Sequence, residues 1–125
     1  MTRTHKYNAR KTERDGHIFD SKKEADYYQD LKYRQMAGEI IKIELQPEYE
    51  LIPGFVHQGK KYQASKYKPD FRITFPDGRV QVIEIKGYSV RDWPIRKKLF
   101  LANNPDVDFL EVKPEKQEKK RRVGA

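Results

Sequence analysis

The stretch Lys68–Gly87 constrains the fold most, because both its turn and its strand register follow from the residues themselves. Pro76-Asp77-Gly78 supplies a turn, since proline fits the φ of an early turn position and glycine fits the left-handed position that follows. A three-residue loop of this kind closes a β-hairpin, and counting outward from it pairs Asp70 with Glu84. The sequence therefore predicts two strands that bring these two carboxylates face to face.

The two acids need a counter-charge, and their surroundings indicate which kind. Residues directly opposite each other in an antiparallel pair have Cβ atoms about 4.5–5.5 Å apart, so the carboxylates of Asp70 and Glu84 would repel each other. Lys86 lies on the same face, two residues beyond Glu84. Mg²⁺ or Mn²⁺ prefers oxygen ligands and would neutralise the acids, while the lysine would stabilise a phosphate or orient a water.

A surface hairpin with scattered charges is the simpler interpretation of the same residues. Gln81–Ile85 argues against it, because this run is β-branched and apolar enough for a central strand. Ile83 and Ile85 would fill one face, and Val82 would share the other face with Glu84. A glutamate in such a strand is costly unless it is paired or metal-bound, which favours a functional site.

These residues also resemble a known family. Pro69-Asp70, followed by Glu84-Ile85-Lys86, resembles the signature of the PD-(D/E)xK nucleases, a superfamily that includes restriction endonucleases and archaeal Holliday-junction resolvases. The similarity extends to Ile18–Ala25 and Leu45-Gln46-Pro47, as in small phage- and prophage-encoded members, and covers roughly residues 6–112.

The resemblance implies a fold, a reaction and a set of ligands. The fold would be α/β, a mixed sheet flanked by helices in the order α-β-β-β-α-β. The reaction would be hydrolysis of DNA phosphodiesters with Mg²⁺, for which Mn²⁺ substitutes, and the product would carry a 5′-phosphate. Asp70, Glu84 and the backbone carbonyl of Ile85 would bind the metal, and Glu24 would belong to the same site.

Local patterns predict elements in the same order. The predicted elements are a helix over 21–37, a strand over 40–43 and 49–52 that is interrupted near Gln46-Pro47, strands over 61–75 and 79–86, a helix over 93–103 and a strand over 107–112. Asp20 or Ser21 would cap the first helix, and Gly38 would end it. Residues 53–59 would form a loop. The second helix would act as a crossover that adds the last strand parallel to its neighbour.

Glu24 lies on the first predicted helix, where its spacing indicates more than one role. Tyr28, Leu31 and Gln35 follow it at spacings typical of one helix face, so Glu24 would face the sheet and the two acids of the hairpin. The alternative is a capping-box glutamate three residues after Ser21, with no part in chemistry.

The net charge of +8 lies at the two ends of the chain. Residues 1–14 carry five Lys or Arg and one acid, residues 113–125 carry six and two, and the segment between carries sixteen of each. We therefore expect a basic, irregular N-terminal arm (1–14), a nuclease domain (15–112) and a basic C-terminal tail (113–125). Such ends suit a polyanion, and DNA is the expected partner; ordinary solubilising tails are the alternative.

Other polar side chains are candidates for contact with the DNA backbone. They flank the hairpin, lie on the second helix or belong to the tail: Gln46, Tyr67, Lys68, Arg72, Arg96, Lys97, Lys98, Lys119, Lys120, Arg121 and Arg122. Such contacts would position DNA without reading its sequence. Alternatively, the basic residues of the helix and hairpin would only form a solvated surface. Gln46 is expected as a buried amide, and its alternative role is to stabilise a break in the strand.

Composition excludes several other classes of protein. The 125 residues contain no cysteine, which excludes disulfides, thiolate metal sites and cysteine nucleophiles. No phosphate-cradling glycine loop is present, and no apolar run approaches membrane length, so we expect a cytoplasmic protein without ATP chemistry.

Together these observations predict a Mg²⁺-dependent endodeoxyribonuclease acting on double-stranded or branched DNA, resembling Holliday-junction resolvases in phage DNA metabolism. The alternative is an inactive relative that keeps the fold for DNA binding, packaging or assembly. The presence of Asp70, Glu84 and Lys86 weighs against it, because an inactive relative would be expected to lose at least one. A symmetric cut in two strands would favour a homodimer.

Overall fold

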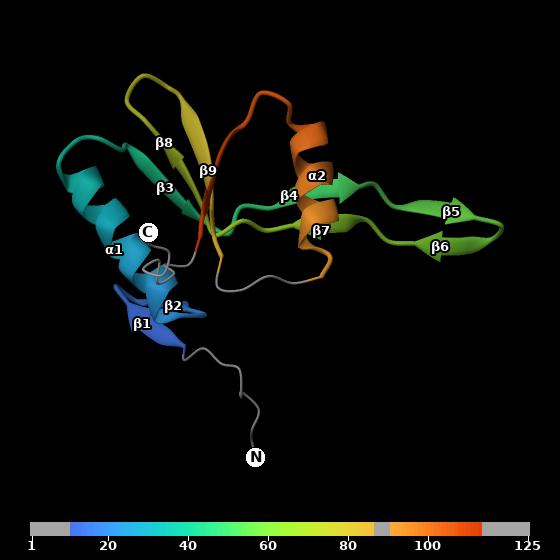
Figure 1. Cartoon of the computed structure of the whole chain (residues 1–125), viewed down its shortest axis with the longest axis horizontal. Coiled ribbons are helices and arrows are strands. Elements are labelled where there is room, and N and C mark those ends of the chain that lie inside the picture. The colour runs from blue at the N-terminus through green and yellow to red at the C-terminus, as the bar shows by residue number, and fades with distance from the viewer. Residues whose placement is uncertain (1–10, 87–90, 114–125) are drawn as a thin grey trace, which may run out of the picture.

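The computed structural model describes residues 11–86 and 91–113, and its central feature is a four-stranded sheet between two helices. The main elements are α1 (Lys22–Met36), β3 (Lys42–Leu45), β8 (Phe71–Thr74), β9 (Val80–Ile85), α2 (Trp93–Asn103) and β10 (Asp108–Val112). The sheet order is β10-β9-β8-β3, with β9 and β10 parallel and the other pairs antiparallel (Figure 1). The predicted mixed α/β class is confirmed.

The β8–β9 hairpin has the predicted turn and register. The Phe75 N–H donates to the carbonyl of Arg79 at 2.8 Å, and Gly78 has a φ of 94°. The register runs Thr74↔Val80, Ile73↔Gln81, Arg72↔Val82 and Phe71↔Ile83. The ladder stops one step before Asp70 and Glu84, because the backbone bends at Asp70. The predicted direct pairing of these two acids is therefore not formed.

Helix α1 covers one face of the sheet, as its apolar spacing predicted. The Ser21 hydroxyl caps it by accepting the N–H of Glu24 at 3.1 Å, and Gly38 follows its end with a φ of 87°. Its buried residues pack in one cluster with the inward residues of β8 and β9, which are Phe71, Ile73, Ile83 and Ile85. Because this face of α1 packs on the sheet, the first turn of the helix, which carries Glu24, lies near one end of the sheet.

Helix α2 covers the opposite face and delivers the last strand. Trp93 and Phe100 pack with Val82, which points away from α1 because it alternates with Ile83. The chain then enters β10, whose register with β9 is parallel and places Glu111 beside Glu84. The predicted parallel addition through the second helix is confirmed.

The segment between β3 and β8 is divided into more strands than the sequence predicted, and the predicted strand over 61–75 is broken at residues 63–64 and 68–70. It holds β4 (Tyr49–Ile52), β5 (Phe55–His57), β6 (Lys60–Tyr62) and β7 (Ser65–Tyr67), in which β4 pairs with β7 and β5 pairs with β6. The predicted loop over residues 53–59 is wrong for 55–57, which form a strand. Figure 1 shows the β5–β6 ribbon extending away from the central sheet and both helices.

The N-terminal segment also differs from its prediction. Residues 12–14, expected as irregular, form β1 (Thr12–Arg14), which pairs with β2 (His17–Phe19). Asp15 and Gly16 form the turn between the two strands, and both have positive φ. The carboxylate of Asp15 accepts a hydrogen bond from the hydroxyl of Tyr28 at 3.0 Å. This tertiary bond to α1 has no local sequence signal, so the strand was missed.

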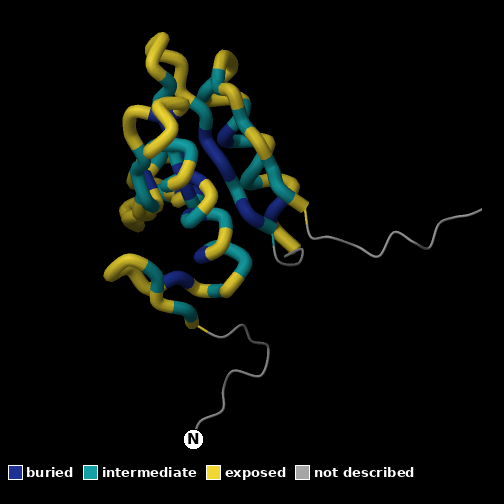
Figure 2. The backbone as a smooth tube through the Cα atoms, turned by 90° about the vertical axis from the view of Figure 1, so that its left-hand side faces the viewer, coloured by how far each residue is buried: buried dark blue, intermediate teal, exposed yellow. Residues whose placement is uncertain are grey.

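Buried residues gather on the central strands and on the helix faces against them, whereas the turns are exposed (Figure 2). The core has two parts, one on each face of the sheet. Neither helix of the described ranges has the length and hydropathy that a membrane crossing requires.

Candidate active site

Asp70 is held at the end of the hairpin by both its backbone and its side chain. It follows Pro69, which is fully buried, and its carbonyl accepts the N–H of Gln46 at 3.0 Å. Its Oδ2 accepts the backbone N–H of Ile85 at 2.7 Å. The carboxylate therefore replaces a backbone acceptor at the point where the ladder stops, which fixes it between β3 and β9.

Glu84 is half-buried on the α2 face of β9. The Tyr67 hydroxyl donates to its Oε1 at 2.5 Å. Burial raises the pKa of Glu84, while the hydrogen bond from Tyr67 and the charge of Lys86 act in the opposite direction and the charge of Glu111 adds to the rise. The net pKa remains raised, so this acid lies in an environment that disfavours its charge.

Glu24 and Asp70 are the most strongly perturbed acids of this end of the sheet. Burial, followed by the charge of Asp20, raises the pKa of Glu24 to about 7. Burial, followed by the charge of Glu24, raises the pKa of Asp70 to about 8, against the lowering effect of the Ile85 N–H. The charge of Glu84 also raises both pKa values, so acids from three separate elements are coupled here.

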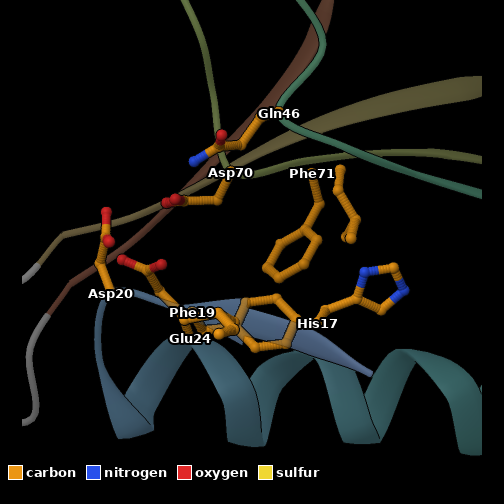
Figure 3. Close-up of a pocket in the computed structure, with 9 residues that line it drawn as sticks. His17, Phe19, Asp20, Glu24, Gln46, Asp70 and Phe71 are labelled. Atoms are coloured by element: carbon orange, nitrogen blue, oxygen red, sulfur yellow. The ribbon is translucent and has the colours of Figure 1, made fainter. Parts of the chain in front are cut away.

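A cavity of about 150 Å³ opens between α1, β2 and the start of β8. Figure 3 shows the carboxylates of Asp20, Glu24 and Asp70 turned towards one another at one side of it, with aromatic rings at the other. Gln46 lines this cavity with an exposed side chain and a φ of 49°. The premise of a buried amide at this position is wrong, because the chain turns at Gln46 and buries Pro47 instead.

The donor set suits a hard divalent cation in its chemistry. Asp70 and Glu84 offer carboxylate oxygens, and Mg²⁺ is usually held by one or two carboxylates together with several waters. Within the described ranges, no three acidic or histidine side chains already form a group that would hold a metal.

Lys86 lies beside these acids at the end of β9. Its side-chain ammonium is 4.3 Å from the centre of the Trp93 ring, and its backbone N–H donates to the carbonyl of Val112 at 2.9 Å. The indole N–H of Trp93 donates in turn to Glu111 at 2.9 Å. The cation–π contact holds this ammonium over the indole ring, where its charge lowers the pKa of Glu84.

Sequence reasoning missed two acids of this region. Asp20 was considered only as a helix cap, yet its charge raises the pKa of Glu24 and Asp70. Glu111 was not singled out, although the predicted parallel strand would have placed it beside Glu84. Burial raises the pKa of Glu111, but hydrogen bonds from Lys97 and Trp93 prevail and lower it.

Several bases predicted to contact DNA are engaged within the fold. Arg72 donates twice to Glu44, at 2.6 and 2.8 Å, and once to the hydroxyl of Tyr49. Lys97 pairs with Glu111 at 2.7 Å, and Arg96 donates to the carbonyl of Lys66 at 2.6 Å. These contacts give the three bases structural roles on the α2 face.

The other predicted contacts divide into three groups. Tyr67 is buried and directs its hydroxyl to Glu84, so its role is to position that acid. Lys68 and Lys98 are exposed. The tail bases Lys119, Lys120, Arg121 and Arg122 lie outside the described residues.

Tyr67→Phe tests the hydrogen bond to Glu84. Loss of a hydrogen bond to a charged group should lower the free energy of unfolding by about 1–3 kcal/mol, and the pKa of Glu84 should rise further because its charged form loses a donor. Urea unfolding and carboxyl NMR titration measure the two effects. Tyr33→Phe, at an exposed tyrosine of α1, is the control and should change neither quantity.

The chain matches the model of a known family. A family model described as a protein of unknown function (DUF1064) matches residues 4–119. No match was found among the curated proteins or among the solved structures.

Proposed function

Because the chain belongs to the DUF1064 family, described only as proteins of unknown function, we propose a function from the site itself: a Mg²⁺-dependent endodeoxyribonuclease of the PD-(D/E)xK type. Its substrate would be double-stranded or branched DNA, and a cytoplasmic location would give it access to that substrate. A homodimer would supply two sites for cuts in two strands.

The observation that carries this proposal is the convergence of three acids at one end of the sheet. Glu24 comes from α1, Asp70 directly precedes β8, and Glu84 lies in β9; the charge of Glu84 raises the pKa of the other two. Such an arrangement destabilises the folded protein by itself, and a bound cation would offset that cost. Two of the three, Glu24 and Asp70, line the cavity, and perturbed acids in a cavity are typical of functional sites.

The order of elements supports the same proposal. The main sheet and its helices follow one another as α1, β3, β8, β9, α2 and β10, the order α-β-β-β-α-β that the nuclease resemblance implies. The residues that resemble the signature lie at adjoining ends of β8 and β9, where the hairpin brings them together.

Each residue has a role in the proposed reaction. Asp70, Glu84 and the carbonyl of Ile85 would hold the metal, which when bound supplies positive charge to the scissile phosphate and lowers the pKa of a water. Lys86 would stabilise the negative charge that develops on the phosphate, and Glu24 would support the site from α1. Water adds to phosphorus and the bond to the 3′ oxygen breaks, which leaves a 5′-phosphate and a 3′-hydroxyl.

The direct test is a cleavage assay with a panel of junction, flap, duplex and single-stranded DNA. We expect cleavage of at least one branched or duplex substrate with Mg²⁺ or Mn²⁺, and none with EDTA. Binding of DNA without cleavage under any of these conditions would favour the alternative of a nuclease fold that binds DNA but does not cut it.

Glu24→Gln should lower the cleavage rate by about 10–100-fold, the usual effect of losing a residue that supports a metal site. The helix cap should survive, because Ser21 accepts the backbone N–H of residue 24, which this change keeps. Single-turnover cleavage and thermal unfolding separate the two roles. A variant with unchanged turnover would leave Glu24 as a capping-box residue only.

A further inference from the structure

The β5–β6 ribbon is a structural feature with no role in the core. Phe55 pairs with Tyr62 across the ribbon, and their rings stack at 4.9 Å with an interplanar angle of 12°. Gln58 and Gly59 close it with φ values of 48° and 78°, the left-handed pair that a two-residue hairpin turn requires. The ribbon is thus a regular hairpin that extends away from the sheet (Figure 1).

Its apolar side chains are exposed. Phe55 is 50%, Val56 66% and Tyr62 39% exposed. All six residues of the two strands are exposed, so the ribbon buries little against the rest of the molecule. Contiguous exposed apolar residues of this kind mark a surface that contacts another molecule.

Its charge indicates what that molecule is. Residues 55–62, which form the ribbon, contain two lysines and one histidine and no acid. Lys60 and Lys61 follow the turn directly, and the Lys60 ammonium is 5.2 Å from the centre of the Tyr62 ring. A purely basic tip with aromatic side chains behind it is complementary to a polyanion.

The shape of the ribbon indicates that this polyanion is duplex DNA. A two-stranded β-ribbon fits the major groove of B-DNA. Because side chains alternate along a strand, Lys60 and Lys61 point to opposite faces of the ribbon. A ribbon entering the groove tip first would then present one lysine to each of the two flanking phosphate backbones.

We propose that the β5–β6 ribbon is a DNA-binding arm that enters the major groove of duplex DNA, with Lys60 and Lys61 as its phosphate contacts. The inference rests on the proposed function in taking DNA as the substrate. The arm leads through β7 to Tyr67, whose hydroxyl donates to Glu84. A duplex bound by the arm would therefore be connected, through β7, to the candidate active site.

The experiment measures binding of a fluorescein-labelled duplex by anisotropy over a series of salt concentrations. All variants carry Asp70→Asn, so that cleavage does not interfere, and the substitution variants are full-length. The test variant adds Lys60→Ala and Lys61→Ala. Its matched control adds Lys32→Ala and Lys42→Ala, which remove the same charge from α1 and β3. Circular dichroism and thermal unfolding confirm that each variant is folded.

We expect the test variant to bind duplex about tenfold more weakly and its slope of log affinity against log salt to fall by roughly two units. The control should retain most of the affinity. A second test variant, with residues 55–62 replaced by Asn-Gly, should show at least the same loss.

Equal loss in the test and control variants would overturn the proposal, because it would reflect net charge alone. The proposal would also be overturned if the protein bound single-stranded DNA more tightly than duplex. The same holds if the protein were a dimer that dissociated when residues 55–62 were replaced. Cleavage by the unmodified protein is measured separately. Its absence would reject the nuclease function, while the binding comparison would still decide the role of the arm.

Discussion

Asp70→Asn is expected to lower the rate of DNA cleavage by about three orders of magnitude, and Glu84→Gln by a similar factor. Each change removes a negative charge from the proposed metal site, and metal stabilisation of the transition state is worth several kcal/mol, of which each ~1.4 kcal/mol is tenfold in rate. The fold should persist, because asparagine keeps an oxygen that accepts the Ile85 N–H. Single-turnover cleavage with saturating Mg²⁺ is the measurement.

The matched control is Glu50→Gln, which removes a charge from an exposed acid of β4. It should cleave as fast as the unmodified protein. Full activity in the Asp70 or the Glu84 variant would reject the assignment of the site, whatever the control shows. Isothermal titration with Mg²⁺ or Mn²⁺ adds a readout apart from activity, since both variants should lose affinity for the metal.

The same Asp70 variant should be more stable than the unmodified protein when no metal is present. The pKa of Asp70 is about 8 in the folded chain, above its ordinary value of 3.8. Between these values the unfolded chain has lost the proton and the folded chain has kept it, so stability falls as pH rises through this window and stays low above it. The Asp70→Asn change removes that loss, and the gain in melting temperature should be largest above pH 8 and small near pH 4.

Lys86→Ala should reduce the turnover number by about 10²–10³-fold, the cost of losing one group that stabilises charge in a transition state. Unlike the acids, Lys86 opposes the binding of a cation. Metal affinity measured by titration calorimetry should therefore be unchanged or slightly higher. This split between turnover and metal binding separates its role from that of Asp70 and Glu84.

Two controls accompany the lysine variant. Lys42→Ala removes an exposed lysine at the start of β3 and should leave turnover unchanged. Lys86→Arg keeps a cation over Trp93 and should recover part of the activity. Loss of metal binding in a folded Lys86→Ala protein would show that the proposed role is incorrect.

The sequence by itself determined the parts of this protein that depend on local chemistry. The Pro-Asp-Gly turn and the alternation of β9 follow from the φ preferences of proline and glycine and from the two-residue period of a strand. The Ser21 cap, the Gly38 end and the buried stripe of α1 follow equally from local rules. The turn predicted the hairpin register, and the cap and stripe predicted the bounds and the buried face of α1.

Only the tertiary structure decided which partner each polar group near the site takes. Asp70 turns to the Ile85 N–H, and Tyr67 is buried against Glu84. Arg72, expected at the DNA surface, forms a paired contact with Glu44 across the neighbouring strand. The β5–β6 ribbon depends on pairing between residues that have little apolar alternation. Each of these choices is a competition between contacts distant in sequence, and its outcome depends on which groups the packed sheet leaves within hydrogen-bonding distance.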